Sequence, residues 1–187
     1  MVSAFSHATV ALALGTLAPP SRLPRRAWGI GAIAAALPDV DYFWHYRLHD
    51  PSSGLGHRGC THSLAAALLV GALATAFAVW RRWPGKRRWW FGYVSLSTAM
   101  HGGLDAMTNG GGGIAFLWPF TDERWRLPWR PIEVAPLSIQ HFFTARGLEV
   151  MCSELLWVWL PVWSMVIGVA VWRRWRRHCA SLNNRTS

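Results

Sequence analysis

The stretch LAAALLVGALATAFAVW, residues 64–80, contains 17 consecutive positions without a charged side chain. A helix needs about 17 to 25 apolar residues to cross the hydrocarbon layer of a bilayer, which is about 30 Å thick. A second uncharged stretch, Leu155–Trp172, has 18 residues. Both stretches predict membrane-spanning helices, so we expect an integral membrane protein of the all-α class.

Two further apolar stretches carry polar side chains in their interior. Val2–Leu17 contains His7 and several hydroxyl groups, and Trp89–Met107 contains His101 and Asp105. An ionisable group within a bilayer is costly unless the protein shelters, pairs or coordinates it. We therefore expect one face of Trp89–Met107 to be sheltered by protein.

A fifth stretch, Ala27–Leu37, has only 11 residues and is short for a full crossing. It is either a half-span or a tilted helix that continues through Trp44. The sequence thus predicts an integral membrane bundle of about five helices. We assign it to a single domain, residues 1–178, followed by a short disordered cytoplasmic tail, residues 179–187.

Basic residues are concentrated beside the apolar stretches. The net charge is +10, and 12 of the 19 Lys and Arg residues form three clusters. The nine acidic residues lie outside all three clusters, which are Arg22, Arg25 and Arg26; Arg81, Arg82, Lys86, Arg87 and Arg88; and Arg173, Arg174, Arg176 and Arg177. This arrangement follows the positive-inside rule of membrane proteins rather than the pattern of a nucleic-acid-binding face. We expect no nucleic-acid partner, and the sequence makes no prediction of the oligomeric state.

The order of charge along the chain also predicts its orientation. Basic residues follow the first apolar stretch instead of preceding it, which argues against a cleavable signal peptide. With all three basic clusters in the cytoplasm, the N-terminus lies outside and the C-terminus inside. Seven of the eight histidines and the acidic residues then gather at the outer end of the bundle, so we expect a polar site there.

The spacing of these polar residues is suited to metal binding. His101 and Asp105 are four positions apart and share one face of a helix. His57 and His62 lie together in GHRGCTHS, residues 56–63. Mixed imidazole and carboxylate ligands suit a divalent ion, with zinc favoured and manganese the alternative. A hydrogen-bonded core histidine is the competing interpretation of each single residue.

Asp39 and Asp41 follow Pro38, where the second helix must stop or bend. Their spacing suits an extended loop in which one carboxylate binds a metal and the other orients a neighbouring ligand. The alternative is a helix cap or a turn. Two more residues stay open, since Cys60 is either a packing residue or a ligand, and His141 either joins the site or does not.

The motifs follow one another in an order that resembles a known family. They are Ser6-His7, LPDVD at 37–41, GHRGCTHS at 56–63, GYVSLSTAMHGGLDAMT at 92–108, LWPF at 117–120 and RWRLP at 124–128. The chain is similar over residues 1–160 to the YdjM-like family of membrane-bound metal-dependent hydrolases. The resemblance implies a multi-helix protein of the bacterial inner membrane with a His/Asp metal site.

A more distant likeness connects the chain with zinc-dependent phospholipase C and the P1-type nucleases. These all-helical enzymes use an ordered series of His and Asp ligands. The downstream His-x-x-x-Glu of that series is missing, because Ala145 stands four residues after His141. Glu149 is the candidate substitute, and we expect two metal ions rather than three.

These inferences combine into one expected function, a membrane-bound metal-dependent hydrolase. It would cleave a phosphoester of a lipid-like substrate with water activated by metal. Asp39 would orient ligands or act as a general base, and Arg58 and Arg126 would stabilise negative charge. The alternatives are a non-catalytic membrane metal-binding protein and a metal-ion transporter. The predicted metal ligands are His7, Asp41, His57, His62, His101, Asp105 and Glu149.

Overall fold

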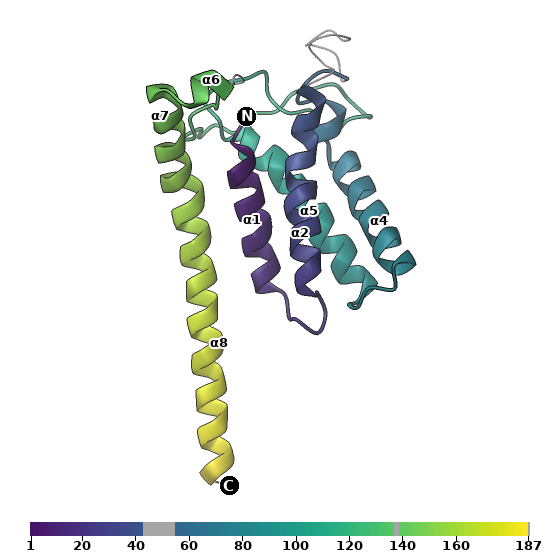
Figure 1. The fold of residues 1–187 in the computed structure, drawn as a ribbon, viewed down its shortest axis with the longest axis vertical. Coiled ribbons are helices and arrows are strands. Elements are labelled where there is room, and N and C mark those ends of the chain that lie inside the picture. The colour runs from purple at the N-terminus through teal and green to yellow at the C-terminus, as the bar shows by residue number, and fades with distance from the viewer. Residues whose placement is uncertain (43–54, 137–138, 187) are drawn as a thin grey trace.

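The computed structural model describes residues 1–42, 55–136 and 139–186 (Figure 1). In these ranges the regular structure is helical, apart from two isolated β-bridges. The all-α prediction is therefore confirmed for the described residues. The helices are α1 (Ala4–Leu17), α2 (Arg25–Ala36), α4 (Leu64–Trp80), α5 (Arg87–Ala106), α6 (Ile139–Phe142), α7 (Ala145–Glu154) and α8 (Leu160–Thr186).

Helix α5 lies at the centre and contacts α1, α2 and α4. Its buried positions recur every three or four residues, as on one face of a helix. Toward the basic end this face is apolar and includes Trp90 and Val94, whereas toward the other end it presents His101 and Asp105. The polar face that the sequence predicted is thus sheltered by protein.

Small residues allow the helices to approach one another closely. A Cβ atom on Gly71 of α4 would come within 1.9 Å of Ser95 Oγ on α5. A Cβ atom on Gly31 of α2 would come within 2.4 Å of the Tyr93 ring. Substitution at either glycine would force the helices apart. The close contacts of α4 with α5 and of α2 with α5 therefore require glycine at these two positions.

Helix α2 ends at Ala36, and the chain continues as the 3-10 helix η1 (Leu37–Asp41). Pro38 ends the α-helix, as expected. Asp39 and Asp41 were expected on an extended loop, and they lie on this 3-10 turn instead. Proline fixes φ near the helical value. A 3-10 helix can therefore include Pro38 in its first turn, where a continuing α-helix would be interrupted. We also considered that this helix continues through Trp44. Residues 43 and 44 lie outside the described residues.

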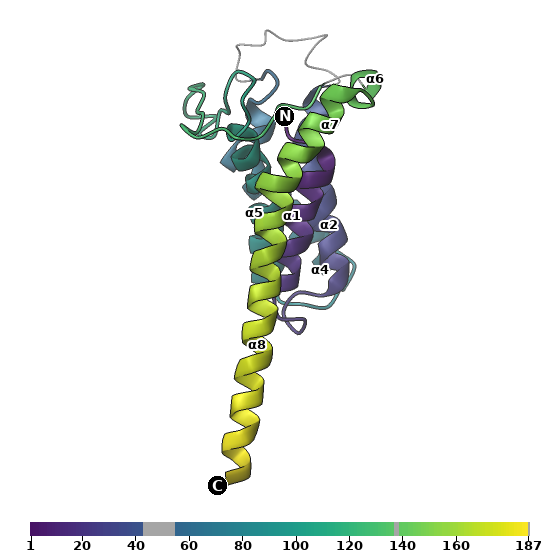
Figure 2. The ribbon, with the colours of Figure 1, turned by 90° about the vertical axis from the view of Figure 1, so that its left-hand side faces the viewer.

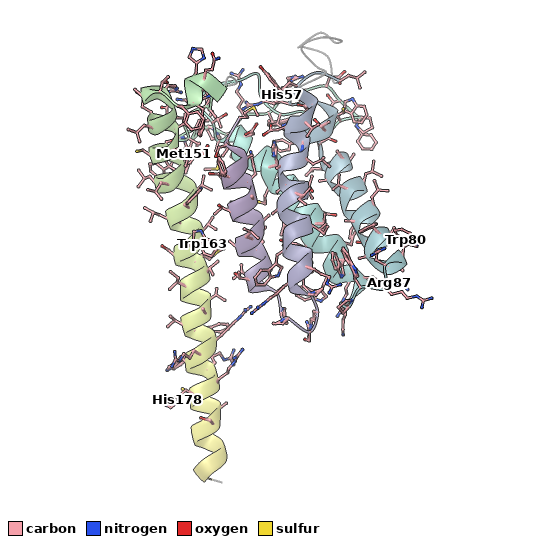
Figure 3. The ribbon with its side chains drawn as sticks, in the orientation of Figure 1. His57, Trp80, Arg87, Met151, Trp163 and His178 are labelled. Atoms are coloured by element: carbon pink, nitrogen blue, oxygen red, sulfur yellow. The ribbon has the colours of Figure 1, made fainter. Side chains whose placement is uncertain are left out.

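The three basic clusters gather at one end of the molecule. Lys86 N donates to Arg22 O at 2.9 Å, which joins the α1–α2 turn to the α4–α5 turn. Arg173 on α8 donates to the carbonyl oxygen of Leu17, the last residue of α1. Figure 3 shows Trp80 and Arg87 at this end and His57 at the opposite one.

The C-terminal helix stands beside α1 and extends well past the end of the bundle (Figures 1 and 2). Helices α7 and α8 are joined by a π-helical turn, η3 (Leu155–Trp159). Pro161 follows this turn; it has no N–H for the carbonyl of Trp157, and the wider turn accommodates the loss. In the described part of the chain, Ala145–Ser181 is the helix long and apolar enough to cross a membrane, whereas α1 and α4 are apolar but shorter.

The last residues differ from the prediction. We expected residues 179–187 to be a disordered tail, whereas α8 continues to Thr186. Once a helix is formed, each added residue gains a backbone hydrogen bond, so an existing helix extends easily into a polar sequence.

Candidate metal centre

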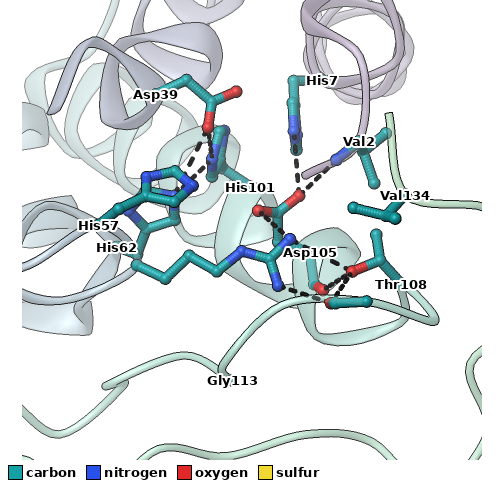
Figure 4. A network of polar contacts seen from close by, with 12 residues as sticks. Val2, His7, Asp39, His57, His62, His101, Asp105, Thr108, Gly113 and Val134 are labelled. Carbon is teal, nitrogen blue, oxygen red and sulfur yellow. Dashed lines mark hydrogen bonds and ion pairs between the residues drawn. The ribbon is translucent and has the colours of Figure 1, made fainter. Parts of the chain in front are cut away.

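Four separate segments bring histidine and aspartate side chains together at the end opposite the basic clusters (Figure 4). Helix α1 supplies His7, η1 supplies Asp39 and Asp41, the segment that ends in the 3-10 helix η2 (Cys60–His62) supplies His57 and His62, and α5 supplies His101 and Asp105. Six of the seven predicted metal ligands therefore lie together, and Asp39 lies with them.

His101 is held so that one ring nitrogen faces the cluster. Its Nδ1 lies 2.7 Å from the carbonyl oxygen of Ala35, near the end of α2. A carbonyl oxygen only accepts, so Nδ1 carries the hydrogen and donates it. Nε2 is left with a lone pair, and it lies 3.0 Å from Nε2 of His62. A histidine whose second nitrogen donates to a backbone carbonyl is typical of metal sites.

The Nε2 atom of His62 faces Nε2 of His101. Its Nδ1 lies 3.3 Å from Asp41 Oδ2, so a hydrogen on Nδ1 would leave the Nε2 lone pair facing His101. Burial by itself lowers the pKa of His62, but the carboxylates of Asp39 and Asp41 outweigh burial and raise it to about 9. Two facing lone pairs repel unless a cation lies between them. A proton on either nitrogen, or a metal ion bound between them, would remove this repulsion.

Asp39 completes a four-residue group. Its Oδ1 lies 3.3 Å from His101 Nε2 and 3.7 Å from His62 Nε2. Burial alone raises the pKa of Asp39, but the two histidines hold it well below its usual range. Neither carboxylate oxygen has a partner with hydrogen-bond geometry. One ligand atom from each of Asp39, His62, His101 and Asp105 can be chosen so that all four lie within 4.8 Å of one another.

Asp41 lies between two histidines and forms a second group with them. Its Oδ1 is 2.7 Å from His57 Nδ1, and its other oxygen accepts a hydrogen bond from the hydroxyl of Thr61. Burial alone raises the pKa of Asp41, but His57 and His62 lower it below its usual range. The carboxylate therefore orients both imidazole rings, whether or not it also binds an ion.

Asp105 is fixed by the N-terminus and by Arg58. Its Oδ1 accepts from the backbone nitrogen of Val2 at 2.6 Å, and Oδ2 lies 3.1 Å from Arg58 Nη2. Arg58 is buried and also donates to Thr108 Oγ1 and to Gly110 O. These contacts occupy both of its terminal nitrogens, so Arg58 positions Asp105.

The backbone around Arg58 is adapted to this role. Arg58 has a φ of 65°, a value that residues with a Cβ rarely adopt. Its guanidinium rests against Gly111, where a Cβ atom would lie 2.1 Å from Nη1, and where φ is 88°. The glycine at position 111 thus provides space for the arginine.

His7 lies flat against His101, with ring centroids 3.7 Å apart. Its Nε2 is 3.7 Å from Asp105 Oδ1, and neither of its ring nitrogens has a hydrogen-bond partner. A fully buried imidazole without partners is uncommon, since buried polar groups are normally paired.

Other predicted site residues lie apart from the cluster. Glu149 is exposed on α7 and accepts a hydrogen bond from Arg146 at 2.9 Å. Arg126 and His141 are exposed, and Cys60 is half-buried with a free thiol. The structure brings none of these four to the metal centre. Of the histidines expected at the outer end of the bundle, His45 and His49 lie outside the described residues.

One buried carboxylate was not predicted. Glu154, at the end of α7, is fully buried and accepts from the backbone nitrogen and the hydroxyl of Ser3 and from Ser6 Oγ. These bonds fasten the start of α1 to α7, next to His7. The available signal was a carboxylate directly before an apolar run, because such a group needs a partner inside the protein.

The residues present suit a divalent ion. The donors are imidazole nitrogens and carboxylate oxygens, the ligands that zinc and manganese accept. Several of these buried ligand atoms, on His7 and Asp39, have no hydrogen-bond partner. Buried polar atoms left unpaired are costly, and coordination would satisfy them.

Known proteins resemble this chain over nearly its whole length. The model of the YdjM inner membrane protein family matches residues 1–178. The chain belongs to this family. It is 38% identical over 176 residues to the inner membrane protein YbcI of Escherichia coli (strain K12), covering 93% of this chain and 99% of that protein. No solved structure matches the chain. The resemblance inferred from the motifs is thereby confirmed, and membership places the chain among inner membrane proteins.

Proposed function

We propose that the chain is an integral membrane hydrolase that uses a divalent metal ion, zinc favoured, to cleave a phosphoester of a lipid-like substrate. The observation that carries the proposal is the pair of facing imidazole nitrogens, His62 Nε2 and His101 Nε2, which lie 3.0 Å apart. The carboxylate of Asp39 lies beside them, with its Oδ1 3.3 Å from His101 Nε2. These nitrogen and oxygen atoms have lone pairs that can coordinate a cation.

Two features support placing the whole bundle in the membrane. Large apolar side chains stay exposed on α4, among them Leu69, Leu73 and Phe77, and on α8, among them Ile167 and Val171. Exposed apolar surface on this scale is unusual for a soluble monomer. The basic clusters lie together at one end, which favours that end in the cytoplasm and the metal centre at the outer side.

Asp39, His62, His101 and Asp105 would hold one ion, and Asp41, His57 and His62 a second. An ion there would supply Lewis acidity and lower the pKa of water toward about 7.

Two residues of the centre would also position others. Asp41 keeps the His57 and His62 rings in place, and Arg58 does the same for Asp105. His57 has 17% of its side chain exposed, so it is the histidine of the cluster that a substrate would meet first. Arg126 is exposed and lies apart from the cluster, so it would contact a phosphate only if the substrate extends to it.

The proposal is tested by measuring metal in the purified full-length protein. His101→Ala and Asp105→Asn should lower bound zinc or manganese about tenfold or more, the usual cost of losing a ligand or its orienter. His141→Ala, an exposed histidine away from the cluster, is the matched control and should keep its metal. Equal metal content in all three variants would overturn the metal centre.

Activity is tested separately on a lipid phosphoester in micelles and on a short-chain soluble analogue with the same headgroup. The expected result is metal-dependent turnover that favours the micellar form and decreases in Arg126→Ala. Metal binding without turnover of either substrate would overturn the hydrolase and favour a non-catalytic metal-binding protein.

A further inference from the structure

An apolar pocket of about 570 Å³ opens beside the metal centre. Its walls come from the start of α1, from the end of α2 with η1, and from the chain around α6. The volume falls in the range of small-molecule sites, about 300–1,000 Å³. The side chains that matter below are Phe5, Ala36, Asp39, Val40, Phe142 and Phe143.

The pocket and the metal centre share Asp39. This residue supplies a carboxylate to the wall of the pocket and also lies 3.3 Å from His101 Nε2. Its two oxygens have no hydrogen-bond partner. A ligand that fills the pocket would therefore bring one of its ends to the cluster.

The remaining wall selects for hydrocarbon. Apart from Asp39, it is built mainly of aliphatic and aromatic groups. A peptide placed there would bury backbone N–H and C=O groups opposite Phe and Val side chains, at a cost of several kcal/mol in unmade hydrogen bonds. A hydrocarbon chain has no such groups and would gain from burial.

The rim of the pocket is apolar and uncovered. Phe5 is 64% exposed, Phe143 83% and Val40 39%. In a family of inner membrane proteins, an exposed apolar rim at a helix end is suited to receiving a chain from the bilayer rather than from water.

We propose that this pocket holds a single alkyl or acyl chain of the substrate, whose phosphate end lies at the metal centre. The inference rests on the proposed function and adds the place where the apolar part of the substrate binds. The class of ligand is a single-chain amphiphile with a phosphate or phosphoester head.

The test uses full-length protein in vesicles that contain a trace of a dodecyl phosphonate with a diazirine in the middle of its chain. A phosphonate keeps the charge of the head and cannot be hydrolysed, so binding is measured without turnover. Crosslinked residues are identified by mass spectrometry. The expected labels lie at Phe5, Val40, Phe142 and Phe143, well above those on the exposed faces of α4 and α8.

Two variants add a large side chain to the lining of the pocket, Ala36→Phe on α2 and Ala4→Phe on α1. Each should lower labelling of the pocket at least fivefold. Ala76→Phe adds the same side chain on an exposed alanine of α4, away from the pocket, and should leave the labelling unchanged. Metal content, measured on each variant, identifies a folded protein, and Ala4→Phe provides the test if Ala36→Phe does not fold.

Labels spread evenly over all exposed apolar helices, or unchanged in both filled variants, would overturn the chain-binding pocket. That failure is distinct from failure of the hydrolase. Pocket labelling without turnover of a phosphoester would remove the catalytic function and leave the binding site, whereas turnover without pocket labelling would do the reverse.

Discussion

At the scale of single residues, His101 connects a helix end to the metal centre. Helix α2 ends at Ala36, and the carbonyl of Ala35, in its last turn, accepts from His101 Nδ1. The C-terminal end of a helix carries partial negative charge, which favours a donor there. The end of α2 thereby fixes the tautomer that leaves Nε2 available.

The raised pKa of His62 predicts how metal binding depends on pH. With a pKa of about 9, His62 is protonated at pH 7 in the metal-free protein, and an ion must displace that proton. Between pH 7 and 9 the metal dissociation constant should therefore fall about tenfold per pH unit. Above pH 9 the dependence on His62 should level off.

Titration calorimetry at pH 7, 8 and 9, in buffers of different ionisation enthalpy, measures both the affinity and the proton released. His141→Ala serves as the control and should show the same slope. A metal affinity that does not change over this range would contradict a proton held between His62 and His101.

Sequence reasoning identified most of these residues because their spacing is local. His101 and Asp105 share a helical face whatever else surrounds them. The charge pattern placed His57 and His62 at the same end of the bundle as His101 and Asp105. Glu149 was misplaced and Glu154 missed, because which of two carboxylates on one helix turns inward depends on packing between distant segments. The role of Arg58 was likewise set by tertiary contacts, with Thr108 and Gly110.

At the scale of helices, the contact between α4 and α5 depends on Gly71. A Cβ atom there would meet Ser95 Oγ and also lie 3.0 Å from backbone atoms of Phe91 and Ser95, so the helices would have to separate. We expect Gly71→Ala to cost about 1–3 kcal/mol of stability, as overpacking does. The measurement is the thermal unfolding of purified protein.

Gly92 on α5 is the matched control, because nothing lies within 4 Å of its Cβ position. Gly92→Ala should be neutral or stabilising by up to about 1 kcal/mol, the difference in helix propensity. Equal melting temperatures for the two alanine variants would argue against the close packing of α4 on α5.

Glu154 joins α7 to the start of α1, and its removal should loosen both. Glu154→Ala leaves buried donors on Ser3 and Ser6 without an acceptor, at about 1–3 kcal/mol for each unpaired group. We expect a lower melting temperature together with weaker metal binding, since His7 follows Ser6 directly. Glu149→Ala, exposed on the same helix, should change neither quantity appreciably.

At the scale of the whole molecule, the C-terminal helix provides a native test of topology. Cys152 on α7 and Cys179 on α8 are both exposed and free. They are 27 residues apart in one helix, about 40 Å at 1.5 Å per residue, more than the hydrocarbon thickness of about 30 Å. The two thiols should therefore lie on opposite sides of the membrane.

Variants that retain one of these cysteines are labelled in intact spheroplasts with a maleimide that does not cross membranes. We expect Cys152 to react from outside and Cys179 only after permeabilisation. The opposite order would place the metal centre in the cytoplasm, and labelling of both from one side would contradict a membrane-spanning C-terminal helix.

The separation of charge along the bundle has a consequence for energised cells. Arginine and lysine clusters lie at one end, and the carboxylates of Asp39, Asp41 and Asp105 at the other. The membrane voltage is negative inside. Moving one elementary charge across it changes the free energy by about 2.3 kcal/mol per 100 mV. In the proposed orientation the voltage attracts the basic end inward and repels the acidic end outward, so respiration itself would help to hold the protein the right way round.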